Sequence, residues 1–420
     1  MNNNYKFKKT LLAVALTLTA IQASAAGFQL NAQSATGLGR AFAGDAVIAD
    51  NASVMSRNAA AMALFDKVEL SLGVNFIKTD ISITDSIYTS NEIESDSNYG
   101  DAGDTSIAPN IHLIVPINEQ FAVGATFYSN FGTKTEFDDS FVGAEYAGLT
   151  DVKSINLGIM ASYRINQQWS VGAGLDIVYG HGILQRQLSS SLSTTLTGGK
   201  STSVTALDVD ADGFGLGFNI GTVFELNKNN RFGFSYHYSP KLETEGDITV
   251  LGNGTVKNDT LTLPLPDMAE FSGYHRLTDS KFAIHYSVQW IGWSAFETLE
   301  TDGSGTLNVY QWKDAMHFSL GGTYYLNETW TLRSGYMYDQ SAQDEITSIS
   351  VPDSDRQWFS AGFTYHFSEN ANVDFGATYL LGQDVSVSEK TVIEEIEYSS
   401  IDATTRADAF LLAVQYSHRF

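Results

Sequence analysis

From Val68 to the last residue, hydrophobic side chains recur at every second position of this chain. Such alternation is typical of β-strands with one apolar face, because successive side chains of a strand point to opposite sides. About fourteen segments of this kind follow one another, and several run to about ten residues. Clear examples are Val68–Phe76, Phe121–Phe127, Trp169–Tyr179, Phe214–Ile220, Phe232–Tyr238 and Phe282–Trp290. The pattern predicts an all-β chain built from long strands.

Short and long connections alternate between these segments. The short ones are rich in asparagine, as in Asn118-Glu119-Gln120 and Asn166-Gln167-Gln168, and asparagine tolerates the backbone angles of tight turns. The long ones are polar and acidic, and we expect loops at Ile81–Thr105, Leu188–Asp212, Gly246–Pro266, Asp339–Asp355 and Ser386–Asp408. Tight periplasmic turns and longer cell-surface loops are typical of outer-membrane barrels. Residues 68–420 are therefore predicted to form a transmembrane antiparallel β-barrel of about fourteen strands.

A soluble β-sandwich or solenoid is the alternative for such a chain. Strands of soluble sheets are typically about five to six residues long, shorter than many of these alternations. The last segment, Phe410–Phe420, also keeps an apolar face up to a terminal aromatic residue. A closed barrel needs such a last strand to pair with the first, because an unpaired edge is not tolerated in a membrane.

The first residues have the order of a secretory signal peptide. Lys6, Lys8 and Lys9 precede the apolar stretch Leu11–Ile21, and Ala23-Ser24-Ala25 offers a small-residue cleavage site. An uncleaved membrane helix is the alternative, but the apolar stretch is shorter than the roughly 20 residues of a membrane span. Residues 1–25 are expected to be removed after export.

Composition narrows the possible functions. The net charge of −24 makes nucleic acid an improbable partner, and the absence of cysteine excludes disulfides and thiolate metal sites. The eight histidines are scattered and stand in none of the usual hydrolase or metalloprotease motifs. The sequence therefore predicts neither an enzyme nor a bound metal or cofactor.

Residues 26–67 differ from the rest of the chain because small residues dominate and the alternation is missing. Ala41–Ala49 and Ala59–Phe65 have the composition of short helices or coil. Wide barrels are often closed by a segment folded into the lumen. We expect residues 26–67 to form such a plug, here called the hatch.

The start of the hatch resembles that of a known transporter family. It is similar to the start of the mature chain in the FadL family of long-chain fatty acid transporters. The segments that carry this likeness are Ala26-Gly27-Phe28-Gln29-Leu30-Asn31, Gly37-Leu38-Gly39-Arg40-Ala41 and Ser56-Arg57-Asn58-Ala59-Ala60. The likeness continues in the family's order through Pro109-Asn110-Ile111-His112, Ser129-Asn130-Phe131-Gly132, Trp312-Lys313-Asp314-Ala315 and Pro352-Asp353-Ser354-Asp355-Arg356. It spans essentially the whole chain after residue 25 and weakens in the long loops.

The resemblance implies a fourteen-stranded barrel with a hatch that takes up fatty acids passively across the outer membrane. Substrate would bind first among the surface loops, then in a lumen pocket against the hatch. It would leave sideways through a kink in the third strand, which Ser129, Asn130, Phe131 and Gly132 match here. Taken alone, a glycine in a strand more often marks an ordinary bulge, although Gly132 permits unusual backbone angles.

The resemblance also suggests which residues meet the substrate. Arg186 matches an arginine proposed to meet the head group, and a guanidinium can hold a carboxylate through two hydrogen bonds. An ordinary lumen arginine paired with an acid is the alternative reading. Lys313 is a second candidate cation, and Phe28 is expected to line the lumen pocket.

One departure concerns the hatch. The family typically has Asn-Pro-Ala where this chain has Asn58, Ala59 and Ala60, so the fixed proline φ angle is missing. We also expect the protein to be a monomer surrounded by outer-membrane lipid and lipopolysaccharide. Two alternatives stay open: uptake of aromatic hydrocarbons or alkanes, and a structural or adhesive barrel that transports nothing.

Overall fold

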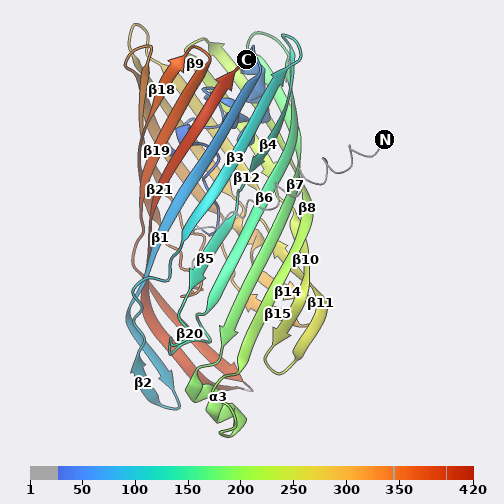
Figure 1. Cartoon of the computed structure of the whole chain (residues 1–420), viewed down its shortest axis with the longest axis vertical. Helices are drawn as coiled ribbons and strands as arrows, with labels where there is room; N and C mark the ends of the chain where they lie inside the picture. Colours follow the sequence, from blue (N-terminus) through green and yellow to red (C-terminus); the bar gives the residue numbers. More distant parts are fainter. Residues whose placement is uncertain (1–26, 344–345, 394) are drawn as a thin grey trace.

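The wall of the molecule closes between its first and last strands. The computed structural model describes residues 27–343, 346–393 and 395–420. Strand β1 (Glu69–Ser90) pairs on one side with β3 (Thr105–Pro116) and on the other with β21 (Ile396–Arg419). The closing pair runs antiparallel from Glu69 opposite Arg419 to Ser90 opposite Ser399. The predicted closed, antiparallel barrel of fourteen strands is confirmed (Figure 1).

The chain crosses the barrel wall repeatedly, and each crossing, here called a pass, pairs with the pass before it and the pass after it. Some passes are split into two strands by a break or bend. The other strands are β2 (Ile93–Asp96), β4 (Phe121–Tyr128), β5 (Gly132–Glu136), β6 (Leu149–Arg164), β7 (Trp169–Gln187), β8 (Thr205–Asn227), β9 (Asn230–Tyr238), β10 (Lys241–Val250), β11 (Gly254–Pro264), β12 (Met268–Arg276), β13 (Phe282–Ile291), β14 (Thr298–Thr301), β15 (Gly305–Val309), β16 (Ala315–Tyr325), β17 (Trp330–Asp339), β18 (Arg356–Ser368), β19 (Ala371–Leu381) and β20 (Val385–Ile393).

The outside of the wall is apolar. Along β21, Phe410, Leu412 and Tyr416 are exposed, whereas Leu411, Ala413 and Gln415 are buried against the interior. Leu216 of β8 is 73 % exposed, which would be costly in water and is favourable in lipid. In the described residues no helix has the length and hydrophobicity needed to cross a bilayer.

Three of the tight turns at one end of the barrel, those that begin at Asn118, Asn166 and Asn327, share a single local structure. In each, an asparagine side chain accepts hydrogen bonds from backbone N–H groups two and three residues later. Asn118 accepts from Gln120 and Phe121, both at 2.9 Å. Asn166 accepts from Gln168 and Trp169 at 2.8 and 2.9 Å, and Asn327 from Thr329 and Trp330 at 2.9 and 2.8 Å. These Asx turns explain why the short connections look alike in the sequence.

At the opposite end the prediction of long loops was mostly wrong. β1 continues to Ser90, β10 and β11 form a hairpin across residues 241–264, and β20 pairs with β21 between Ser386 and Asp408. A short helix, α3 (Ser190–Thr197), lies between β7 and β8. These strands lie toward the end of the barrel that carries α3 (Figure 1). With water available on the outside, backbone pairing can continue without the alternation by which membrane strands are found.

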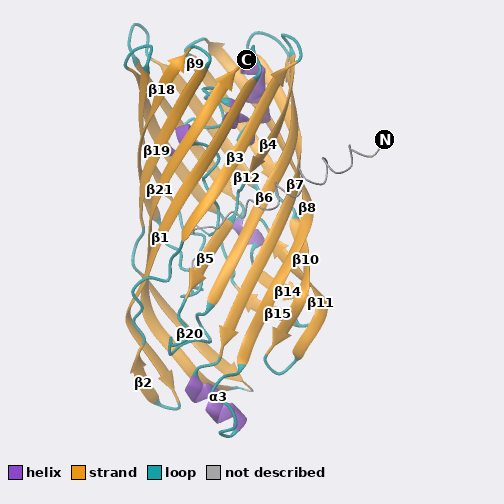
Figure 2. Ribbon diagram, in the orientation of Figure 1, coloured by secondary structure: helices purple, strands orange, loops and turns teal. Residues whose placement is uncertain are grey.

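The hatch lies inside the barrel, as Figure 2 shows for its short helices. They are α2 (Ala35–Leu38), η1 (Ala52–Ser56) and η2 (Ala59–Leu64). α2 packs against β18, β19 and β21, whereas η2 packs against β6, β7 and β8. The predicted signal peptide, residues 1–25, lies outside the described residues.

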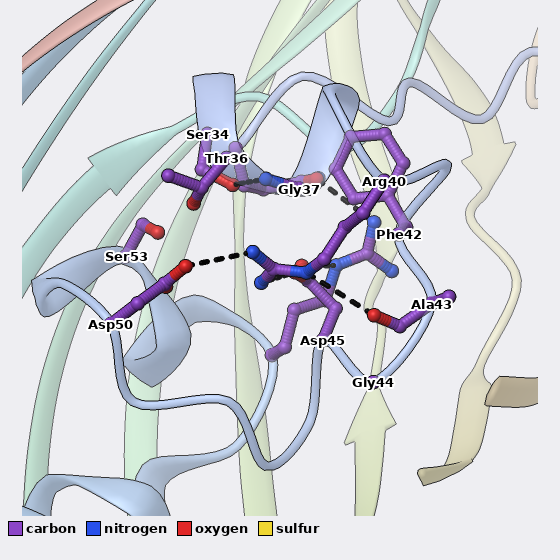
Figure 3. A network of polar contacts seen from close by, with 12 residues as sticks. Ser34, Thr36, Gly37, Arg40, Phe42, Ala43, Gly44, Asp45, Asp50 and Ser53 are labelled. Carbon is purple, nitrogen blue, oxygen red and sulfur yellow. Dashed lines mark hydrogen bonds and ion pairs between the residues drawn. The ribbon is translucent and has the colours of Figure 1, made fainter. Parts of the chain in front are cut away.

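A buried network of charges joins the hatch to the wall. Arg40 pairs with Asp45 at 2.6 Å and with Asp50 at 3.0 Å (Figure 3). Asp50 also lies 3.3 Å from Arg333 of β17, and Arg57 of the hatch lies 3.5 Å from Glu270 of β12. Removing one partner of such a pair leaves an uncompensated buried charge, which typically costs about 3–5 kcal/mol. The hatch is therefore held in a defined position.

Candidate functional site

The third pass of the wall is broken where the sequence resemblance expects a kink. β4 ends at Tyr128 and β5 begins at Gly132. Tyr128 lies opposite Asn156 of β6 and Gly132 opposite Lys153, so three residues face two on the partner strand. This arrangement is a β-bulge with one extra residue. As a result, inward-facing positions change from even numbers in β4 to odd numbers in β5, where Thr133 lines the interior.

Hydrogen bonds to Ser154 of β6 hold the bulge. The hydroxyl of Ser129 donates to the Ser154 carbonyl, and the N–H of Phe131 donates to the Ser154 hydroxyl at 3.1 Å. None of the residues from Ser129 to Gly132 has a positive φ. The break therefore does not use the special backbone freedom that the sequence suggested for Gly132.

On its other edge, the broken strand pairs with the hatch. The N–H of Leu30 donates to the Asn130 carbonyl at 2.6 Å, and the N–H of Gly132 donates to the Phe28 carbonyl at 2.7 Å. Within residues 27–343, β3 pairs with β4 only from Ile111 to Pro116 and does not pair with β5. A seam of the wall is thus left unpaired between β3 and β5, and the start of the hatch lies against it.

An apolar cavity lies beside this seam. It is lined largely by apolar side chains, among them Leu184, Leu261, Leu263 and Leu299. Phe28 of the hatch contributes to its wall, 2 % exposed, with ring centroids 4.7 Å from Trp293, 5.2 Å from Phe296 and 5.7 Å from Trp312. Trp293 belongs to the short helix η3 (Trp293–Ala295), which follows β13. The hatch and two separate segments of the barrel thus build one aromatic surface.

A second, more polar cavity shares Leu184, Leu299 and Tyr310 with the first. Arg186 lies in its wall on the inward face of β7, two residues beyond Leu184. Its Nη1 donates to the carbonyls of Leu149 and Gln185 at 2.7 and 2.8 Å, and its Nη2 donates to the Thr150 hydroxyl at 2.6 Å. No ion pair joins Arg186 to a carboxylate among the described residues, so the expected alternative of an acid-paired lumen arginine is not what the structure has.

The other predicted cation lies elsewhere. Lys313 is exposed and does not line either cavity, although its neighbour Trp312 lines the apolar one. The backbone N–H of Lys313 donates to the Ala342 carbonyl at 2.9 Å. The structure therefore brings Phe28, Arg186 and the strand break to two adjoining cavities and leaves Lys313 outside both.

The hatch turn without proline is held by Asn58. Its Oδ1 accepts from the Ala60 N–H at 3.0 Å, and its Nδ2 donates to the carbonyls of Ala46 and Thr222 at 2.8 and 3.1 Å. Thr222 belongs to β8, and Ala59 and Ala60 are buried against β7. Asn58 thus fixes the turn and joins it to the wall without the φ restriction of proline.

Sequence reasoning missed Glu389 of β20, one of the two acidic residues that line the polar cavity. Its segment was assigned to a loop, although Val385, Val387 and Glu389 keep the two-residue period of a strand. The aromatic residues around Phe28 were also missed, because they come from separate segments that only the closed barrel brings together.

Comparisons with known proteins agree with this architecture. Residues 16–420 match the family model described as outer membrane protein transport protein (OMPP1/FadL/TodX). A long-chain fatty acid transport protein of Escherichia coli O6:H1 is 39 % identical over 93 % of this chain and 94 % of its own length. Outer membrane protein P1 of Haemophilus influenzae is 35 % identical over 99 % of this chain and all of its own.

Solved structures share the fold. A FadL homologue from Pseudomonas aeruginosa superposes with a TM-score of 0.83, at 23 % identity, over 94 % of this chain and all of that one. The toluene transporter TbuX of Ralstonia pickettii does so with a TM-score of 0.65, at 19 % identity, over 92 % of this chain and 98 % of that one.

Proposed function

Since the chain belongs to the OMPP1/FadL/TodX family of outer-membrane transport proteins, whose members are transporters rather than enzymes, we propose that it takes up long-chain fatty acids across the bacterial outer membrane. The observation that carries this proposal is the apolar cavity beside Phe28, which continues into a polar cavity holding Arg186. An apolar chamber with one cation at its end fits an aliphatic tail with a carboxylate.

The energetics of the substrate support this assignment. Burial of an aliphatic chain yields about 0.8 kcal/mol for each methylene group, so the tail supplies most of the binding free energy. The carboxylate must not be buried without a partner. In the part of the chain that the structure describes, no carboxylate pairs with Arg186, and its Nη atoms donate to neutral groups. Its charge is therefore available to a substrate anion, and a charge-assisted hydrogen bond contributes about 1.5–3 kcal/mol.

We further propose that the substrate leaves the barrel through the seam between β3 and β5. Transfer into periplasmic water would forfeit the burial energy of the tail, whereas passage through the wall leads from cavity to lipid. The bulge at residues 129–131, next to the apolar cavity, is the observation that supports this route. The start of the hatch would have to leave the edge of β5 for the seam to open. The working unit would be a monomer surrounded by outer-membrane lipid and lipopolysaccharide.

A second candidate substrate class is supported by the aromatic rings around Phe28, Trp293, Phe296 and Trp312. Aromatic hydrocarbons stack well on such surfaces and need no cation. Fatty acids remain the first choice because Arg186 would have no role toward an uncharged hydrocarbon. A structural or adhesive barrel would give no reason for two adjoining lumen cavities.

Uptake by cells separates these functions. A strain that lacks this gene and its relatives is complemented with the chain, and uptake of radiolabelled oleate and toluene is measured. Oleate uptake, with growth on oleate as sole carbon source, is the expected result. Uptake of toluene alone would select the hydrocarbon alternative, and uptake of neither by a correctly assembled barrel would leave the structural one.

A further inference from the structure

The polar cavity contains a carboxyl group as well as Arg186. Glu389 lies on β20, which pairs with Ile396–Thr405 of β21, beyond the exposed apolar residues that begin at Phe410. Its Oε1 accepts from the Ile349 N–H at 2.8 Å, and its Oε2 accepts from the Ser348 hydroxyl at 3.3 Å. Glu389 and Arg186 line the same cavity without forming an ion pair with each other. A substrate carboxylate held by Arg186 would therefore share the cavity with a second carboxyl group.

Two carboxylates close together in one cavity repel each other unless one of them carries a proton. We propose that Glu389 is a second head-group determinant, which in its protonated form accepts the substrate anion beside Arg186, so that capture of a fatty acid takes up a proton from water. This inference rests on the proposed fatty acid function and deepens it. No covalent bond changes: one proton moves from solvent to the Glu389 carboxylate, and its O–H then donates to the anion.

The surroundings of Glu389 support this assignment. Burial raises the pKa of Glu389 to about 7, despite hydrogen bonds from Ile349 and Ser348 and the charge of Arg186, all of which act in the opposite direction. Without a ligand, Glu389 is thus close to the midpoint of its titration at neutral pH. An anion on Arg186 offsets the one positive charge that opposes protonation, so binding raises the pKa of Glu389 further.

The other titratable groups facing this cavity are Glu145, Tyr146 and Tyr310. Both Glu145 oxygens are occupied, by the hydroxyls of Tyr88 and Ser399 at 2.7 Å and by the Ser189 N–H at 3.0 Å. The Tyr146 hydroxyl donates to the Ser399 carbonyl at 2.8 Å, and burial raises the pKa of Tyr146 to about 12. Burial also raises the pKa of Tyr310. We therefore assign the pH dependence of anion binding in this cavity to Glu389.

The direction of the pH effect on affinity follows from the linkage between protonation of Glu389 and binding of the anion. Binding of an anion is strongest while Glu389 is protonated, below its pKa of about 7. Above that pH the affinity falls by at most about tenfold for each pH unit, until the higher pKa of the occupied state is reached.

The test uses hexadecyl sulfonate, an anion that stays ionised throughout this range, so that only the protein titrates. Its dissociation constant is measured for the full barrel in lipid nanodiscs at pH 6 and 8.5. We expect wild-type binding to weaken by about tenfold to thirtyfold at pH 8.5. Glu389→Gln, which stays neutral and keeps a donor, should bind equally well at both pH values. The exposed Glu94 of β2 provides the matched control, and Glu94→Gln should keep the wild-type pH dependence.

A second measurement needs no variant. Calorimetry of sulfonate binding to the wild type in two buffers of different ionisation enthalpy counts the protons taken up, and a net uptake between pH 7 and 8 is expected. No uptake, or the same pH dependence in Glu389→Gln as in wild type, would overturn the role of Glu389. Failure of the proposed function looks different, because the sulfonate and oleate would then not bind at any pH or would bind independently of Arg186.

Discussion

The amide oxygen of Asn58 occupies the space in which residue 221 would place a side chain. A Cβ added to Gly221 of β8 would come within 2.0 Å of Asn58 Oδ1. At Gly172 of β7 an added Cβ would come within 2.3 Å of the Ala60 backbone nitrogen. Glycine in two neighbouring strands thus lets the hatch turn lie directly against the wall, and it explains how the turn keeps its place without proline.

Gly221→Ala should therefore displace the hatch turn while leaving the barrel closed. The Asn58 bonds to Ala46 and Thr222 would have to lengthen or break, and we expect a loss of stability of about 1–3 kcal/mol. The melting temperature and the rate of proteolytic cleavage near Arg57 measure the effect. Gly100→Ala, where no atom lies within 4 Å of the added Cβ, is the control. Wild-type values for Gly221→Ala would mean that the hatch is not seated by this contact.

Arg186→Ala should weaken binding of oleate more than binding of its methyl ester. Only the free acid loses a charge-assisted hydrogen bond, which corresponds to about 1.5–3 kcal/mol or a tenfold to hundredfold change in affinity. Arg406→Ala is a matched control, because Arg406 pairs with Asp384 and Asp408 outside both cavities. Equal losses for acid and ester would remove Arg186 from the head-group role.

The bulge offers a test of lateral release. Deletion of Asn130 and Phe131 would preserve the alternation of a regular strand, and the sequence alone favours that design. The pairing with β6 shows only one extra residue, so deletion of Asn130 alone should restore both the register and the inward direction of later residues. We expect the deletion variant to fold and to bind oleate. Its uptake of oleate should fall sharply, because continuous strand pairing would close the seam between β3 and β5. Uptake at the wild-type rate by the folded variant would require another exit, most directly past the hatch.

A disulfide between the hatch and the bulge tests whether the two must separate. Gln29 and Phe131 are bridge partners, flanked by the hydrogen bonds of Leu30 and Gly132, and this arrangement places Cα atoms about 4.5 Å apart. Cysteine can form a disulfide at that spacing, and the chain contains no other cysteine. The pair Gln29→Cys and Phe131→Cys should block oleate uptake when oxidised and restore it when reduced. Uptake unchanged by oxidation would show that the hatch end can stay in place during release.

The amino-acid sequence by itself determined the barrel, its strand number and the turns at one end. These features depend on local patterns, because lipid rewards an apolar residue at every second position and an asparagine side chain caps its own turn. It also indicated a separate hatch in residues 26–67, since that segment lacks the alternation.

Only the tertiary structure decided where the strands end, how many extra residues the bulge holds and what surrounds Arg186. Outside the membrane strand pairing needs no sustained hydrophobic period, and the two valines Val385 and Val387 are too short a pattern to set β20 and Glu389 apart from an acidic loop. The register of β5 is set by β6, and the aromatic surface around Phe28 joins segments more than 260 residues apart. Such relations arise from closure of the wall around the hatch, which no local pattern in the chain encodes.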